Sequence, residues 1–411
     1  MKFLNKQFTQ ETLKLALPVM LTQVGQVSVN LFDNIIVGKL LGAKALAAVS
    51  LGNAMFFSIF IFGLGFSLAI PPLVSEAHSQ HDHNRINSIF RHGFVVNIIL
   101  AFVLMLLIFG IIPLMPYLNQ PKEILPDTIT FLSIVTLSII PFMIFQTMRE
   151  VSEGLSFTIG VTKATIFANI INVILNYVFI EHFKMGVAGS AWATFIARVA
   201  MMVFLYYVLI KEEKTRRYIK DFSLKIKDFT KEMFEKLIRL GFPTALQLFF
   251  EVTAFAGAAF ICGLISAKDI AAHQIALSMA SFTFNLCVGF SVASTVMIGR
   301  KLGEKDFVNL EKVGFNNLKI AFIFMLMCGL VFILGKDVLP TFFTKKEDIA
   351  VVELASQLMI IAALFQLSDG IQVTALGCLR GIQDVKIPSI LTFIAYWVIT
   401  IPLGYYLTVP M

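Results

Sequence analysis

The chain has 411 residues, of which 57% are hydrophobic and only 14% charged, whereas soluble domains carry about 25% charged residues. This composition excludes an ordinary soluble protein, because so much apolar surface must face lipid instead of water. The net charge of +7 could suit nucleic acid, but the basic residues lie between long apolar segments, which is typical of membrane topology.

Eleven apolar segments are long enough to cross a bilayer core about 30 Å thick. Because lipid offers no hydrogen-bond partners to an exposed backbone, these segments are predicted to be helices. In chain order they are residues 13–37, 46–72, 93–117, 127–147, 163–181, 186–210, 236–264, 270–298, 315–335, 348–377 and 388–408. Pro18, Pro141, Pro243 and Pro402 lie inside or near the ends of segments and predict kinks or breaks. The fold class is therefore an all-α polytopic membrane protein.

Lys and Arg residues are distributed unevenly between the two sides of this predicted topology. The N-terminal tail and the even-numbered loops hold 23 of the 33, counting residues at span edges, and the opposite loops hold 8. Because basic loops stay in the cytoplasm, the N-terminus is predicted to be cytoplasmic, in an inner (plasma) membrane. The basic segment after the sixth span is then a cytoplasmic linker beside anionic lipid.

An internal repeat relates the two halves of the chain. The matching segments are Leu15-Ala16-Leu17-Pro18 with Leu240-Gly241-Phe242-Pro243, Gly65-Phe66-Ser67 with Gly289-Phe290-Ser291, and Phe145-Gln146 with Phe365-Gln366. We therefore predict two six-helix bundles of the same orientation, as in transporters built from parallel repeats. Their boundaries are residues 1–210 for an N-terminal lobe, 211–235 for the linker and 236–411 for a C-terminal lobe. Twelve spans are expected and about eleven are present, so we expect a C-terminally truncated sequence.

Three carboxylates lie inside predicted spans, where a charge costs about 2.5–3.5 kcal/mol or more. Asp33 ends a polar stripe on one face of the first span, after Gln23, Gln26 and Asn30. Glu251 lies in the seventh span and Asp369 in the tenth. Such residues are candidates for a functional site, although polar groups in membranes also bond one helix to another.

Further polar residues could complete a cation site around Asp33. Asn172 and Asn176 are one helical turn apart on the fifth span, and Thr194 lies on the sixth. A carboxylate with amide and hydroxyl oxygens suits sodium or a proton, whereas transition metals prefer Cys or His. Binding and helix packing are equally good interpretations of these three residues. Gln274, at the start of the eighth span, is a candidate to face a cavity.

Arg198 is a cation in the middle of the sixth span. The sequence leaves three partners open: Glu150, Glu153, or lipid headgroups that it reaches by snorkelling.

No sequence motif for catalysis is found, and His81-Asp82-His83 near His78, which resembles a metal-binding tract, is interpreted as a solvated cytoplasmic loop. HExxH, GxSxG, a P-loop and aspartate-rich metal motifs are missing, and the four cysteines lack zinc spacing. We therefore expect no enzymatic activity, no cofactor and no bound metal.

At these residues the sequence resembles the multidrug and toxic compound extrusion (MATE) family, in its NorM-type branch. The most specific stretches are Leu31-Phe32-Asp33, Phe249-Phe250-Glu251-Val252-Thr253, Ala271-Ala272-His273-Gln274-Ile275-Ala276-Leu277, Leu379-Arg380-Gly381, Asp369 with Gln372-Val373, and Tyr396-Trp397-Val398. The resemblance covers essentially the whole chain up to the missing twelfth helix.

The resemblance implies two lobes around a central cavity and the export of cationic amphiphilic compounds in exchange for sodium ions or protons. By position, it implies one cation site at Glu251 and Asp369, and a second at Asp33 with Asn172, Asn176 and Thr194. Asp33, Gln274, Glu251, Asp369 and Phe365 would also bind substrate. Pro18 matches the proline at which the first helix of the family bends. Phe365 replaces a tyrosine of some relatives, which removes a hydroxyl from the ion site.

The alternative function is a lipid-linked oligosaccharide flippase of the same superfamily. Such a protein is expected to line its cavity with several basic residues for pyrophosphate, whereas only Arg198 lies mid-span here. The expected partners are small cationic organic compounds and membrane lipid, without nucleic acid, and the expected state is a monomer.

Overall fold

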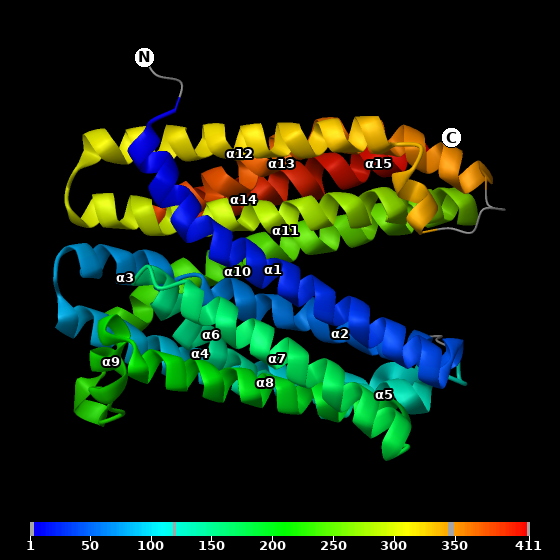
Figure 1. The fold of residues 1–411 in the computed structure, drawn as a ribbon, viewed down its shortest axis with the longest axis horizontal. Helices are drawn as coiled ribbons and strands as arrows, with labels where there is room; N and C mark the ends of the chain where they lie inside the picture. Colours follow the sequence, from blue (N-terminus) through cyan, green and yellow to red (C-terminus); the bar gives the residue numbers. More distant parts are fainter. Residues whose placement is uncertain (1–3, 118–120, 344–348, 409–411) are drawn as a thin grey trace. The chain divides into compact units, whose positions relative to one another are not determined.

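A computed structural model describes residues 4–117, 121–343 and 349–408. These residues form helices and connecting turns without strands, as Figure 1 shows. The α-helices are α1 (Lys6–Leu41), α2 (Ala43–Ser67), α3 (Ile70–Ser79), α4 (His83–Ile111), α5 (Leu125–Leu137), α6 (Ile139–Gly154), α7 (Ile159–Tyr177), α8 (Gly186–Lys211), α9 (Glu213–Lys220), α10 (Lys231–Ile265), α11 (Ala267–Gly303), α12 (Phe307–Gly335), α13 (Ile349–Gly381), α14 (Lys386–Phe393) and α15 (Ile401–Thr408). Two π-helical stretches, Val178–His182 and Ile394–Thr400, follow α7 and α14.

The predicted membrane spans are confirmed. Among the described residues, ten helical stretches are long and apolar enough to cross a membrane, and the bent pair α5–α6 makes up to eleven. Helices α2 and α3 together form one such stretch, Ala43–Ser79. The spans extend beyond the predicted segments, because polar residues at the ends of a helix keep the helical backbone after the apolar run stops.

Proline affects the spans in different ways. The fourth span bends by 42° between α5 and α6, three residues before Pro141, whose ring and missing N–H interrupt the preceding turn. Pro18 and Pro243 lie inside α1 and α10, which are helical on both sides. Pro402 follows the π-helical stretch Ile394–Thr400. The break between α2 and α3, just before Pro71, was not among the predicted sites.

The chain divides into two compact units. The N-terminal unit contains residues 21–245, and the C-terminal unit contains residues 1–20 and 246–411. These boundaries differ from the predicted ones at residues 210 and 236, because α1 and α10 each contribute to both units. The predicted linker therefore belongs to the N-terminal unit. Within the C-terminal unit α11, α12 and α13 run side by side (Figure 1), and within the N-terminal unit α7 packs along α8.

The two units repeat the same local geometry. His81 and Lys305 both have positive φ, and the next residues, Asp82 and Asp306, cap α4 and α12 by accepting a bond from the backbone N–H three residues on. The two members of each pair are 224 residues apart in the chain, which is also the offset between Gly65-Phe66-Ser67 and Gly289-Phe290-Ser291. The predicted repeat is thus supported over the first two spans of each copy and the turn that follows them.

The predicted match of Phe145-Gln146 with Phe365-Gln366 is wrong. Gly154 packs under Val74, and Gly381 packs in the same way under Ile298. The turns that follow have positive φ at Ser156 and Gln383. Aligning these features shifts α13 by seven residues relative to the Phe-Gln match. With 41 Phe in the chain, a two-residue identity inside an apolar helix arises easily by chance.

Helices α11 and α13 approach each other closely at Gly377. The hydroxyl of Thr295 donates to the carbonyl of Gly377 at 2.9 Å, and the hydroxyl of Ser291 donates to the carbonyl of Val373 at 2.6 Å. A Cβ on Gly377 would overlap with the carbonyl oxygen of Ser291. Small residues and hydroxyl bonds of this kind hold helices together in membranes, where lipid provides no hydrophobic drive.

We expect Gly377→Ala to destabilise the C-terminal unit by about 1–3 kcal/mol, because overpacking outweighs the better helix propensity of alanine. The measurement is thermal unfolding of the purified protein in lipid nanodiscs. Gly314→Ala in α12 is the matched control, since its Cβ would meet only Ile298 Cδ1 at 3.8 Å and Cys378 Sγ at 3.9 Å. Equal melting temperatures for the two variants would contradict the prediction.

Candidate functional site

Two acidic side chains come together inside the C-terminal unit. Glu251 on α10 and Asp369 on α13 are 6% and 8% exposed, and their charges interact. Arg380, also on α13, is a cation whose charge reaches Glu251. Two buried carboxylates that interact favour the uptake of a proton or another cation, because both cannot hold a negative charge without cost.

Polar groups next to the acids extend this site. Gln247 precedes Glu251 by one helical turn, is 1% exposed, and its Nε2 has no hydrogen-bond partner among the described residues. Tyr396, in the π-helical stretch Ile394–Thr400, interacts electrostatically with both acids. Its hydroxyl accepts a 3.4 Å hydrogen bond from Nε2 of Gln372 on α13. The acids thus lie beside an amide and a phenol that could orient a bound cation or substrate.

Aromatic side chains fix the segment that carries Tyr396. The indole Nε1 of Trp397 donates to the carbonyl of Phe250 at 3.2 Å. The ring of Phe250 lies 4.9 Å from that of Phe393, and the ring of Phe255 lies 6.1 Å from that of Tyr396. The turn containing Glu251 is therefore held against α14 and the stretch that follows it.

The remaining residues predicted for this site make different contacts from those of the two acids. Phe365 packs with an apolar cluster that includes Ala276 and Phe332. Gln274 on α11 is exposed, and its side chain makes no hydrogen bond within the described residues. Their predicted roles in substrate binding remain predictions.

A second polar cluster lies in the N-terminal unit. Nδ2 of Asn176 on α7 donates to Oδ1 of Asp33 on α1 at 2.6 Å and lies 3.4 Å from Oδ1 of Asn172. All three residues are buried, with exposed fractions of 8% or less. Oδ1 of Asn176 has no hydrogen-bond partner among the described residues. It is a buried acceptor beside a carboxylate, which suits a cation or a donor on a ligand.

Thr194 lies on α8 and makes no side-chain hydrogen bond in the part of the chain that the structure describes. The structure therefore joins Asp33, Asn172 and Asn176 by hydrogen bonds but adds no such bond for Thr194.

Arg198, one turn after Thr194, is the cation of this cluster. Its charge interacts with that of Asp33. Nη1 donates to the hydroxyl of Ser138 at 2.7 Å, and Cζ lies 4.8 Å and 5.1 Å from the ring centroids of Phe56 and Phe142. Two aromatic faces and one hydroxyl thus stabilise the guanidinium at the bend between α5 and α6.

The partners that the sequence offered for Arg198 are not the ones the structure shows. Glu153 pairs instead with Arg149, four residues earlier on α6, at 2.7 Å. Glu150 accepts a 2.9 Å bond from Nε2 of Gln146. Arg149 was missed because the fourth span was predicted to end at residue 147, whereas α6 continues to Gly154 with these side chains buried.

Some residues that neighbour the acids could be predicted from their spacing in the sequence. Arg198 follows Thr194 by four residues and therefore shares its helix face. Gln247 precedes Glu251 by the same interval. Tyr396 gave no such signal, because its helix is distant in the chain. Within the described residues, no group of three or more His, Cys, Asp or Glu side chains lies close enough to hold a metal ion.

Comparison with known proteins identifies one family model and several relatives that match most of this chain. A family model described as MatE matches residues 18–178 and 243–406. The multidrug resistance protein NorM of Photobacterium profundum is 31% identical over 404 residues, which cover 97% of this chain and 87% of that protein. The probable multidrug resistance protein NorM of Agrobacterium fabrum is 33% identical over 407 residues, with coverage of 97% and 87%.

Solved structures share the fold. A transporter of the MOP superfamily from Pyrococcus furiosus has a TM-score of 0.88 at 20% identity, covering 98% of this chain and 88% of that chain. A eukaryotic MATE transporter has a TM-score of 0.87 at 16% identity, with coverage of 96% and 88%.

Proposed function

The chain belongs to the MatE family, and from this membership and the buried acids we propose that it is a multidrug efflux antiporter. It exports cationic amphiphilic compounds in exchange for sodium ions or protons. The observation that carries the proposal is the pair Glu251 and Asp369, two interacting carboxylates buried in a membrane-spanning unit. Intramembrane acids of this kind mark ion and substrate pathways, because they are too costly to keep without a function.

Coupling follows from competition for the carboxylates. A carboxylate can hold a proton, a sodium ion or the positive group of a drug, but not all of them together. If the ion and the drug favour states that open to opposite sides of the membrane, the ion gradient drives export. Each elementary charge that crosses the membrane potential contributes about 2.3 kcal/mol per 100 mV.

The acid of the N-terminal unit has a different environment. Asp33 accepts a bond from Asn176 and interacts with Arg198, so one cationic partner is built into the protein. We propose that this cluster is the second cation site, at which protonation of Asp33 favours a bend of α1 near Pro18. Because the guanidinium of Arg198 already supplies a positive charge, this cluster should bind a cation differently from the Glu251–Asp369 site.

Gradient-driven transport needs no catalytic machinery and no resident cofactor. We propose accordingly that the protein is not an enzyme, and that its partners are small cationic organic molecules and membrane lipid. It acts in the inner membrane, as a monomer, with a cytoplasmic N-terminus.

Ethidium efflux from proteoliposomes tests the proposed function. We expect an imposed sodium gradient, or a proton gradient in its place, to drive dye movement that is missing in protein-free liposomes and without a gradient. Comparing the two gradients identifies the coupling ion. Failure of both gradients to move ethidium or other cationic dyes would overturn the proposal.

A further inference from the structure

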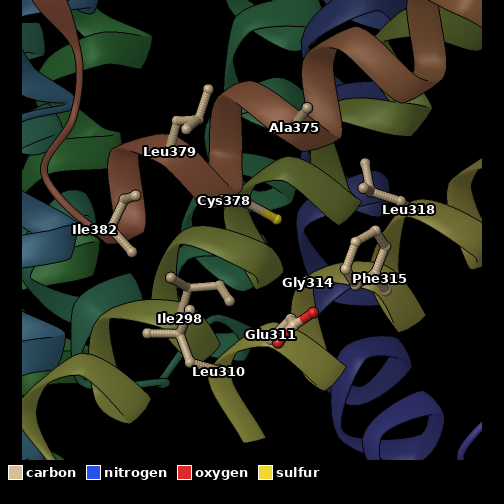
Figure 2. Close-up of a pocket in the computed structure, with 10 residues that line it drawn as sticks. All are labelled: Ile298, Leu310, Glu311, Gly314, Phe315, Leu318, Ala375, Cys378, Leu379 and Ile382. Atoms are coloured by element: carbon tan, nitrogen blue, oxygen red, sulfur yellow. The ribbon is translucent and has the colours of Figure 1, made fainter. Parts of the chain in front are cut away.

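An apolar groove lies on the C-terminal unit, formed by the end of α11, the first turns of α12 and the last turns of α13. Its volume is about 300 Å³. Figure 2 shows the residues that line it, among them Ile298, Glu311, Phe315 and Cys378. None of these residues belongs to the candidate sites described above. We call this feature the α12 groove.

The space in the α12 groove exists because residue 314 is glycine. A Cβ at Gly314 would lie 3.8 Å from Cδ1 of Ile298 and 3.9 Å from Sγ of Cys378, which are ordinary contact distances. A side chain would therefore fit there, and its absence leaves room between α11, α12 and α13. In Figure 2 the sulfur of Cys378 extends from α13 toward this space.

The repeat identifies the corresponding surface in the N-terminal unit. The capping residues Asp82 and Asp306 begin α4 and α12 in the same way, which sets the register between these helices. In this register Glu311 corresponds to Asn87, Gly314 to Phe90, Phe315 to Arg91 and Leu318 to Phe94.

That corresponding surface is covered by the polypeptide that follows α9. The ring of Phe222 lies 4.9 Å from that of Phe90 and 5.2 Å from that of Phe94. Arg91 forms an ion pair with Asp228 at 3.2 Å. The N-terminal unit thus shows what this kind of surface accepts: an aromatic group on its apolar part and an opposite charge at its edge.

Tyr218 of α9 adds to this cover. Its hydroxyl lies 2.8 Å from Nδ1 of His83, and burial raises the pKa of Tyr218 above its usual value. The hydroxyl therefore stays protonated at neutral pH, so the cover on α4 needs no change of protonation to form.

The α12 groove carries an acidic residue at its edge, one helical turn from the position that corresponds to Arg91. Glu311 is the charged residue among those that line it, and no hydrogen bond or ion pair engages its carboxylate among the described residues. Phe315 replaces the basic Arg91 and is 57% exposed. The complementary occupant therefore combines an apolar group with a positive charge.

We propose that the α12 groove binds a cationic amphiphile, with its apolar part between Ile298 and Cys378 and its positive group beside Glu311. The volume lies at the lower end of the range for small-molecule pockets, about 300–1,000 Å³, so one aromatic ring or short alkyl chain fills it. The assignment of this occupant as a transport substrate rests on the proposed function. The binding itself does not, because it is argued from Glu311, Gly314 and the repeat.

Protection of Cys378 from alkylation tests the proposal. The protein in lipid nanodiscs is treated with N-ethylmaleimide, and modification of each cysteine is followed by peptide mass spectrometry. The probes are octyltrimethylammonium, octanol and octyl sulfate. At ten times its Kd, the cation should slow alkylation of Cys378 by about tenfold, as mass action requires. Octanol and octyl sulfate should protect far less, and Cys287, which is fully buried, is the internal reference.

Two variants connect protection to the groove. Glu311→Gln should remove the preference for the cation over octanol. Gly314→Phe should slow alkylation of Cys378 without any amphiphile, since the ring would occupy the same space. Glu311 is exposed and Gly314 is half-buried in the groove, so thermal unfolding in nanodiscs checks that both variants fold.

Three results would overturn the proposal. The first is equal protection by octyl sulfate, and the second is an unchanged cation preference in Glu311→Gln. The third is a Cys378 that does not react even without amphiphile in the wild type, because the groove would then not admit even a small reagent. The readout is binding alone, so a protein that exports no dye can still confirm the groove, and an active exporter can still refute it.

Discussion

Glu251→Gln should abolish gradient-driven dye efflux while leaving the protein folded. Glutamine has nearly the shape of glutamate, so the packing of α10 against α14 and the Trp397 bond to the Phe250 carbonyl are retained. The amide cannot exchange a proton for a cation, however, so the ion gradient no longer drives movement of the drug. We therefore expect the rate of ethidium efflux from proteoliposomes to fall by at least about tenfold.

Glu232→Gln is the matched control for Glu251→Gln. Glu232 lies in the first turn of the same helix and is exposed, so the same chemical change there should leave efflux at the wild-type rate. Gel filtration of both variants establishes that they fold alike. Wild-type efflux in Glu251→Gln under either ion gradient would show that this carboxylate does not couple ion and drug.

Asp33→Asn should remove the pH dependence of transport and reduce export. The asparagine carbonyl can still accept the bond from Nδ2 of Asn176 that Asp33 accepts at 2.6 Å, so the contact between α1 and α7 is kept. What disappears is the charge that interacts with Arg198 and the ability to take up a proton. The variant mimics the protonated state permanently.

Dye binding and efflux measured across roughly pH 6 to 8 check this prediction. Cation binding at Glu251 and Asp369 should partly survive, so binding should decrease less than transport. Asp127→Asn, in the first turn of α5, is the control for an acid-to-amide change in the same unit. If Asp33→Asn retains the wild-type pH profile, Asp33 is not the switch, and its polar stripe only packs helices together.

The two acids of the C-terminal unit illustrate which features of the site the sequence predicts and which it does not. Glu251 and Asp369 are identifiable because each is a charge inside an apolar run, which is a property of the local sequence. Their interaction is a property of the fold, since Glu251 and Asp369 lie more than a hundred residues apart in the chain. The same holds for Tyr396, whose nearness to both acids depends on how the stretch after α14 packs on α10.

The spans themselves are determined by sequence, because the free energy of placing a helix in lipid is nearly a sum over its own residues. That is why the eleven apolar segments and the break near Pro141 could be predicted. The unit boundaries could not, because the division inside α1 and α10 depends on which neighbours each half of a long helix contacts.

The sequence by itself determined that this is an all-α membrane protein with an internal repeat and three intramembrane acids. Only the tertiary structure decided that Asn176 bonds Asp33, that Arg198 bonds Ser138 instead of Glu150 or Glu153, and that Gly381 is the counterpart of Gly154. The physical reason is the distance along the chain over which each kind of interaction acts. Hydropathy and capping act within a few residues of the chain, whereas each of these contacts joins separate helices, and their partners become fixed only when the helices pack.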